Sequence, residues 1–264
     1  MAKEKIIQLS KIEEKDYAEM EFPPIVYKYR DWADPMHKTI ITKREVFFAS
    51  PNSFTDPFDC KIPIRHDLLN YADVKQKISK DHPEWNSEQR NGFIKDWFGG
   101  HRDEIMKLQE KNMSEFMDRF GVLSLTEIPD NNFMWFMYAD NFRGFCIGFV
   151  SNIMFPHLKG GGGPVVYYDT LPVIYPTPKN LLEEQHYLQI FSKLKEWEFE
   201  HEYRTHIFSQ RQMSINDRKR VIPPEAFKEI IFGKNMLDNI KEDLLNNIPN
   251  ELGHIKLKEQ EPIC

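Results

Sequence analysis

The segment GFCIGFV (residues 144–150) is apolar at nearly every position, and it constrains the fold more than any other stretch of the chain. A strand that is covered on both faces has such a continuous apolar pattern, whereas a strand with one solvated face alternates apolar and polar residues. We therefore expect residues 144–150 to form a central strand of a sheet with packed layers on both sides.

Shorter segments rich in β-branched and aromatic residues predict further strands. They are VYKYR (26–30), EVFFAS (45–50), GVLSL (121–125), PVVYYD (164–169), EYRTHIF (202–208) and FKEIIFG (227–233). Apolar residues at helical spacing predict helices within about 67–120, at about 180–196 and around 240–245, and residues 130–132 are expected to cap a short helix. The sequence thus predicts one α+β domain over residues 1–264, with a mixed or antiparallel central sheet, flanking helices and a helical insertion at about 67–120.

Residues 160–163 are four consecutive glycines. Such a run has no side chains to pack, so we expect a hinge or mobile loop there, either native or introduced by engineering. The run lacks the Lys-Ser/Thr that would follow in a phosphate-binding loop.

Composition excludes several classes of protein. Of the 264 residues 41% are hydrophobic, which is too many for a disordered chain, and a net charge of −6 gives no overall basic surface for nucleic acid. Three cysteines without a CxxC pair and nine histidines without HxH or HExxH spacing predict neither a disulfide framework nor a metal site. The start MAKEKIIQLSKIEEKDY is charged, and no uncharged apolar run approaches the ~20 residues that span a bilayer, so we expect a cytoplasmic protein without a membrane partner.

The stretch WEFEHEYR (197–204) has the most unusual charge pattern in the chain. If it lies in a strand, Glu200, Glu202 and Arg204 point to the same face, because side chains alternate with period two. Carboxylates that share a face need solvent, a cation or a catalytic task. Two interpretations follow: a structural Glu-Arg ladder, or a Glu-x-Glu pair on the wall of a cleft that Trp197 closes on one side.

Three other motifs contribute candidate site residues. In VYKYR, Tyr29 and Arg30 stand at a strand end, where a guanidinium can hold a phosphate or carboxylate, although an edge strand with one wet face explains the same pattern. In SPNSFTDPFD (50–59), serine and two aspartates at a strand end can line a cleft, although Asx turns explain an aspartate before proline. In MWFMYAD, Trp135 and Tyr138 share a helix face, a spacing more typical of a core pair than of a ligand platform.

The motifs VYKYR, FFASPNSFTDPFD, LSLTE, NNFMWFMYADNFRGFCIGF, VVYYD, KEWEFEHEYR and PPEAFKEIIFG occur in this order along the chain. As an ordered set they resemble the family known as domain of unknown function 2971, over about residues 26–233. The family pattern usually has Asn, His and His where this chain has Thr55, Met137 and Phe142, so any histidine role in the family has no counterpart here. The family name implies no activity.

The order of a strand ending in a basic residue, a strand with a Ser/Phe turn and a late Glu-x-Glu also resembles the layout of ADP-ribosyltransferases. Those enzymes split the nicotinamide–ribose bond of NAD through an oxocarbenium-like centre, which a carboxylate stabilises. The resemblance implies that Arg30 holds the pyrophosphate and that Glu202, or Glu200 in the other register, is the catalytic glutamate. The residues expected to line the NAD site are Tyr29, Ser50, Ser53, Phe54, Asp56, Asp59, Trp135, Tyr138 and Arg204.

The function implied by this resemblance is that of an NAD-consuming enzyme, of the kind found among bacterial toxins and phage-defence effectors. Its expected partners are NAD, a nucleic-acid or protein acceptor, and a neutralising antitoxin. One alternative is a non-catalytic module that binds a peptide or nucleic acid through Trp135, Tyr138 and the basic run 218–220. Another is a metal-dependent nuclease, for which the candidate residues are Asp56, Asp59, Glu200 and Glu202.

Overall fold

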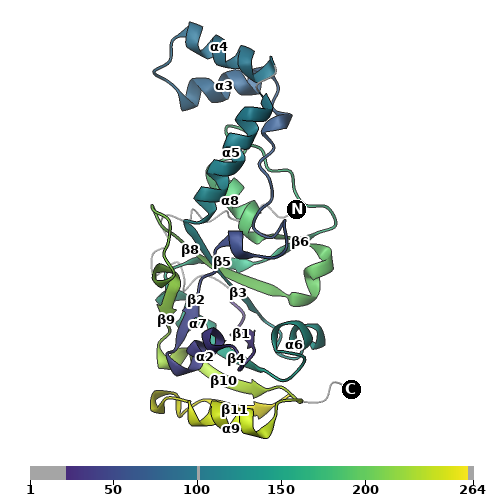
Figure 1. Ribbon diagram of the computed structural model, residues 1–264, viewed down its shortest axis with the longest axis vertical. Helices are drawn as coiled ribbons and strands as arrows, with labels where there is room; N and C mark the ends of the chain where they lie inside the picture. Colours follow the sequence, from purple (N-terminus) through teal and green to yellow (C-terminus); the bar gives the residue numbers. More distant parts are fainter. Residues whose placement is uncertain (1–21, 100–101, 261–264) are drawn as a thin grey trace.

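A mixed seven-stranded sheet forms the centre of the molecule in a computed structural model that describes residues 22–99 and 102–260. The strand order is β11-β10-β4-β1-β3-β8-β5 (Figure 1). The strands are β1 (Ile25–Arg30), β3 (Phe120–Thr126), β4 (Phe145–Val150), β5 (Gly161–Pro164), β8 (Glu202–Phe208), β10 (Phe227–Phe232) and β11 (Lys256–Glu259). Within this sheet only β10 and β11 pair in parallel, and helices flank the sheet, so the predicted α+β class with a mixed sheet is confirmed. The charged N-terminal stretch and Cys264 lie outside the described residues.

The predicted central strand is confirmed as β4. It pairs antiparallel with β1 on one side and β10 on the other, and five of its six residues are buried. β1 is itself an interior strand, between β4 and β3, which removes the edge-strand explanation for VYKYR.

Helices cover both faces of the sheet. On one face, Ile147 and Phe149 pack with residues of α2 (Pro35–Thr42), α7 (Ser151–Leu158) and α9 (Asp238–Asn246) in the main core. On the other face, Tyr29 and Cys146 pack against α6 (Asn132–Tyr138). α6 begins as predicted, because the side chain of Asn131 accepts hydrogen bonds from the amides of Phe133 and Met134.

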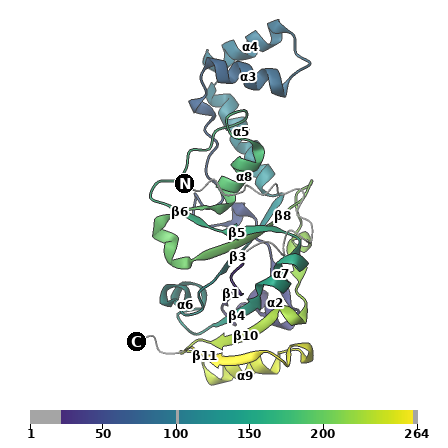
Figure 2. The same ribbon diagram turned by 180° about the vertical axis from the view of Figure 1, so that it is seen from behind.

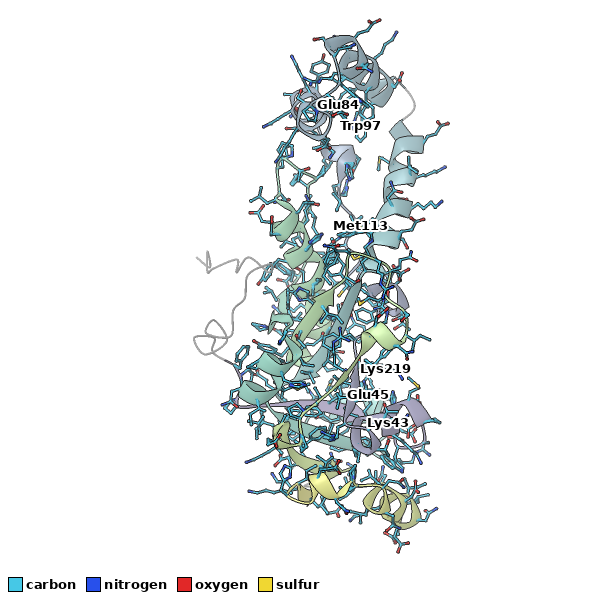
Figure 3. All side chains as sticks on the ribbon, turned by 90° about the vertical axis from the view of Figure 1, so that its left-hand side faces the viewer. Lys43, Glu45, Glu84, Trp97, Met113 and Lys219 are labelled. Atoms are coloured by element: carbon cyan, nitrogen blue, oxygen red, sulfur yellow. The ribbon has the colours of Figure 1, made fainter. Side chains whose placement is uncertain are left out.

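Three helices project from one end of the sheet (Figures 1 and 2). They are α3 (Tyr71–Asp81), α4 (Ser87–Phe98) and α5 (Arg102–Met117). Asn70 and Asn86 each close a capping box at the start of α3 and α4. α3 and α4 form a hairpin with its own small core around Trp97, and α5 connects the hairpin to the sheet (Figure 3). These helices lie within the stretch predicted to be helical.

The segment 45–50, predicted as one strand, is not a single strand in the structure. Glu45–Phe47 forms β2, which pairs with β9 (Lys219–Val221) in a separate two-stranded ribbon. Ala49 pairs with the main sheet through an isolated bridge to Val122, and Val46 and Phe48 pack in the main core.

The prediction of a mobile loop at the glycine run is wrong. Gly160 directly precedes β5, and the other three glycines belong to β5, which pairs with β8 at the edge of the central sheet. A Cβ atom added at Gly160 would lie 2.6 Å from the carbonyl oxygen of His206, and one at Gly162 would lie 2.9 Å from that of Arg204. The glycines therefore permit a close approach between two backbones.

The predicted helix at 180–196 is too long. α8 ends at Phe191 (Leu182–Phe191), β7 (Ser192–Leu194) pairs in parallel with β6 (Val166–Tyr168), and a 3-10 helix, η3 (Lys195–Glu200), follows. His201 then takes a left-handed conformation with φ of 42°, so β8 starts at Glu202. Glu200 therefore does not belong to the strand, contrary to the prediction of one continuous face.

Candidate functional site

A pocket of about 310 Å³ opens inside the central sheet, between β1 and β3. These strands share one register pair, Tyr27 with Thr126, whereas β1 pairs with β4 at six positions and β3 with β8 at seven. Residues 27–30 and 124–126 line the pocket where the β1–β3 ladder has ended. The pocket is thus a wedge between two strands that separate from each other.

Nine of the twelve predicted site residues line this one pocket. They are Tyr29, Arg30, Ser53, Phe54, Asp56, Asp59, Tyr138, Glu200 and Glu202. They come from four separate parts of the chain, so the fold brings together motifs that the sequence could only place in order.

The other three predicted residues lie elsewhere. Ser50 caps a short 3-10 helix, and its hydroxyl donates to Asp118. Trp135 is fully buried, contacts Tyr29 edge to face and donates its indole N–H to Pro129. Trp135 and Tyr138 therefore do not form a joint ligand platform.

Arg204, the third of these residues, is fully buried behind the pocket wall and holds Glu202. Its Nε and Nη2 atoms each donate to one oxygen of Glu202 at 2.8 Å, and Nη2 also lies 2.7 Å from Asp59. Burial opposes the charge on Glu202, but Arg204 and Lys193 outweigh it and lower the pKa of the carboxyl to about 2. This bidentate contact matches the structural Glu-Arg ladder, one of the two interpretations of residues 197–204.

Lys193, at the centre of β7, joins the carboxylates of the pocket. Its ammonium group donates to Glu200, lies 3.3 Å from Glu202 and 3.8 Å from Asp59, and stands over the ring of Trp197. Burial opposes its charge, yet the three carboxylates raise the pKa of Lys193. The amine of Lys193 thus lies at the centre of a cluster of three carboxylates.

Glu200 is the carboxylate held less tightly. One oxygen accepts from Lys193 and the other accepts from the Tyr138 hydroxyl at 2.6 Å. Burial raises the pKa of Glu200, and the nearby charge of Glu202 adds to the effect despite Lys193. The pocket therefore contains one carboxylate fixed as an anion and, two residues earlier, one that gains a proton more readily.

Two basic residues on β1, Lys28 and Arg30, face the pocket and form no salt bridge with a carboxylate among the described residues. Among residues 22–99 and 102–260, Arg30 has no salt bridge, and its one hydrogen bond goes to the backbone of Tyr29. Lys28 donates across the wedge to the carbonyl oxygen of Ser124. Burial lowers the pKa of Arg30 to about 10, and burial with the charge of Arg30 lowers that of Lys28 well below its usual value. A bound anion would relieve both effects.

Aromatic side chains form the remaining walls. Trp197 in η3 and Phe54 line the pocket together with Tyr138. The indole Nε1 of Trp197 is buried and has no hydrogen-bond partner in the part of the chain that is described. An N–H donor is thus available beside the aromatic wall.

Lys28 and Lys193 also line the pocket, although neither is among the predicted site residues. The prediction places Lys193 in the helix at 180–196, because those residues have helical spacing, whereas the apolar stretch IFSKL around it is a local signal of burial. Lys28 belongs to the strand face that the edge-strand interpretation expects to be wet. The partners of both lysines are distant in the sequence, so no local pattern identifies them.

The residues proposed for the two alternatives are otherwise engaged. In the basic run, Arg218 is buried and donates to three backbone carbonyls, and Lys219 lies 3.2 Å from Glu45 (Figure 3). No group of three or more His, Cys, Asp or Glu within the described ranges is arranged to hold a metal ion. None of the described helices is long and apolar enough to cross a membrane.

Comparisons with protein-family models, with curated proteins and with solved structures gave no match for this chain. The arguments about function therefore depend on the pocket itself.

Proposed function

We propose that the chain is an NAD-consuming enzyme of the ADP-ribosyltransferase kind, with the β1–β3 wedge as its active site. The observation that carries this proposal is the composition of the pocket. Two partly buried basic residues, Lys28 and Arg30, line it without a salt bridge among the described residues, together with the buried carboxylate of Glu200 and aromatic walls. That combination meets the needs of a dinucleotide whose glycosidic bond is cleaved through a cationic centre. Membership of the family of domain of unknown function 2971 is part of the proposal.

Lys28 and Arg30 bind the pyrophosphate. The guanidinium of Arg30 provides paired donors that match phosphate oxygens, and Lys28 adds a point charge. A volume of about 310 Å³ accommodates the nicotinamide–ribose end of NAD, and the adenosine end extends from the mouth of the pocket.

Trp197 and Tyr138 bind the nicotinamide ring. The free indole N–H of Trp197 donates to the carboxamide oxygen of the ligand, which satisfies a buried donor. The rings also exclude water from the reacting centre.

Glu200 stabilises the transition state. The bond between the ribose C1′ and the nicotinamide nitrogen breaks, its electron pair leaves with neutral nicotinamide, and positive charge develops on the ribose. The carboxylate of Glu200 accepts a hydrogen bond from a ribose hydroxyl and takes the proton of the attacking water or acceptor hydroxyl, whose oxygen forms the new bond to C1′.

Glu202 has a structural task in this scheme. Both of its oxygens accept from Arg204, so it fixes the wall on which Lys193 and Glu200 depend. The resemblance to ADP-ribosyltransferases implies that the catalytic glutamate is Glu202, or Glu200 in the other register. We assign that role to Glu200. A toxin or phage-defence context, with an acceptor molecule and an antitoxin, belongs to the same proposal.

The test is the release of free nicotinamide from NAD by the purified chain, with and without added RNA, DNA or cell protein. We expect Glu200→Gln to lower kcat by about 10²–10⁴-fold, the range for loss of a general base. Arg30→Ala should raise KM by about 10–100-fold, because a charged hydrogen bond to phosphate is lost. Glu198→Gln, an exposed carboxylate on the same η3 helix, is the matched control and should leave turnover unchanged.

If the folded wild-type chain releases no nicotinamide under any of these conditions, the proposal is wrong. Equal loss of turnover in Glu198→Gln and Glu200→Gln would also contradict it, since only one of these carboxylates faces the pocket.

A further inference from the structure

A second cavity in the described part of the chain is separate from the wedge and belongs to no function discussed above. It measures about 800 Å³ and lies between α5 and the extended segment 61–67. Met106, Met113 and Met117 line it from α5, at spacings that place them on one helix face (Figure 3 labels Met113). We refer to it as the α5 pocket.

Apolar side chains from two elements form the walls of the α5 pocket. Ile62 and Ile64 face it from the extended segment, opposite the methionines. Methionine side chains are flexible and polarisable, so they adapt to ligands of irregular shape and contact aromatic rings favourably. A pocket of this volume with a mainly apolar lining is typical of sites for organic molecules of drug size.

Gln189 provides one unsatisfied polar group at this pocket. The side chain is 1% exposed, and its Nε2 donates to the carbonyl oxygen of Ile62 at 3.1 Å. That bond fixes the orientation of the amide, because the opposite orientation would set two carbonyl oxygens against each other. Its Oε1 is consequently an acceptor, and it has no hydrogen-bond partner among the residues that the structure describes. A buried acceptor without a donor is costly unless a ligand supplies one.

We propose that the α5 pocket is a second ligand site, which takes a mainly apolar organic molecule with one hydroxyl or N–H donor directed at Oε1 of Gln189. The volume and the methionines select the apolar body of the ligand, and the orphan acceptor selects the donor. This inference stands independently of NAD turnover.

Residues that line the α5 pocket lie close in sequence to residues that line the wedge. Asn52 lines the α5 pocket, while its neighbours Ser53 and Phe54 line the wedge. Gln189 likewise lines the α5 pocket, and Lys193 on the following strand lines the wedge. An occupant of the α5 pocket therefore contacts Asn52, directly before Ser53 of the wedge, and Gln189, four residues before Lys193.

The test uses two aromatic probes of nearly equal size, 2-naphthol and 2-methoxynaphthalene, which differ in a hydroxyl donor. The full chain is labelled with ¹³C at the methyl groups of its 11 methionines and titrated with each probe by NMR. We expect saturable shifts at Met106, Met113 and Met117 with 2-naphthol, at a Kd about five- to tenfold lower than with 2-methoxynaphthalene. Met134, which lines the wedge, is the internal control and should shift less.

Two variants test separately the hydrogen bond to Gln189 and the need for free space in the α5 pocket. In Gln189→Leu the acceptor is lost, so the two probes should bind with equal Kd. In Met106→Trp the pocket is filled from the half-buried face of α5, so both probes should lose binding. The methyl spectrum of each variant reports whether it is folded.

Shifts spread over all methionines without saturation would overturn the proposal, as would equal affinity for the two probes in wild type. Unchanged binding in Met106→Trp would overturn it too, because the ligand would then lie elsewhere.

Discussion

Glu200 and Glu202 are two positions apart, but their surroundings shift the pKa values of their carboxyl groups in opposite directions. Glu202 meets a bidentate guanidinium at 2.8 Å, whereas Glu200 meets a hydroxyl and shares the amine of Lys193. Sequence patterns marked both residues as equivalent, because the left-handed turn at His201 and the burial of Arg204 depend on the tertiary structure. Two neighbouring carboxylates of one short segment therefore differ in how readily they gain a proton.

The Glu202→Gln substitution should lower the free energy of unfolding by about 3 kcal/mol, because it breaks a buried ion pair and leaves Arg204 with Asp59 as its remaining carboxylate partner. Urea unfolding measures this change. Glu198→Gln, on the exposed side of η3, should stay within about 0.5 kcal/mol of wild type. Equal stability of Glu202→Gln and wild type would show that the pair contributes nothing.

Ionisation of Glu202 should make the free energy of unfolding depend on pH in the acid range. Its pKa in the folded chain is about 2, compared with an ordinary value of 4.5, so the unfolded chain binds the proton first as pH falls. The contribution of Glu202 is therefore fully present above pH 4.5 and is lost as pH falls toward 2. Unfolding free energies measured across this range should fall more steeply in wild type than in Glu202→Gln, by up to ~1.4 kcal/mol per pH unit; parallel curves would contradict the assignment.

Glu200 should govern the acid limb of catalysis if the proposed function holds. Burial raises its pKa above the ordinary 4.5, and the proposed step needs the ionised carboxylate. The rate of nicotinamide release should therefore decline with falling pH at a midpoint above 4.5. A profile of kcat against pH measures this midpoint, and a flat profile down to pH 4.5 would be inconsistent with Glu200 as the base.

At the scale of elements, patterns that are local in sequence predicted the structure well. The apolar run of β4 and the asparagine caps of α4 and α6 follow from neighbouring residues alone. The wedge between β1 and β3 and the pairing of β5 with β8 depend on partners far away in the chain, so no local pattern predicts them. Nine residues to which charge patterns and the resemblance in motif order pointed line the wedge, whereas Lys28 and Lys193 look ordinary until their neighbours are known.

The two glycines Gly160 and Gly92 should respond to alanine in opposite ways. A Cβ at Gly160 would lie 2.6 Å from a backbone oxygen, so Gly160→Ala should lower the free energy of unfolding by about 1–3 kcal/mol. Gly92 lies in exposed α4 with nothing within 4 Å of an added Cβ, so Gly92→Ala should raise helix stability by about 0.5–1 kcal/mol. Thermal unfolding of the two variants compares them directly. If Gly160→Ala were neutral, the close approach of β5 to β8 would be in doubt.

For the whole molecule, stability should be uneven. The hairpin of α3 and α4 has a separate core of four buried residues, Leu69, Val74, Ile94 and Trp97, whereas β4 lies in the main core. Amides of α3 and α4 should therefore exchange hydrogen through local opening, with protection at least about tenfold lower than that of β4. Hydrogen exchange followed by mass spectrometry measures this difference. Equal protection in the two regions would show that hairpin and sheet unfold together.

The helix α5 has the geometry of a lever. One end of its 16 residues packs beside the sheet through Met113 and Met117, and the other end leads to the hairpin (Figures 1 and 3). At 1.5 Å per residue the arm is about 24 Å long, so a tilt of ~10° at its base displaces the hairpin by about 4 Å. A small adjustment of packing around the methionines is thus amplified into a displacement that a pair of dyes, one on the hairpin and one on the sheet, would register.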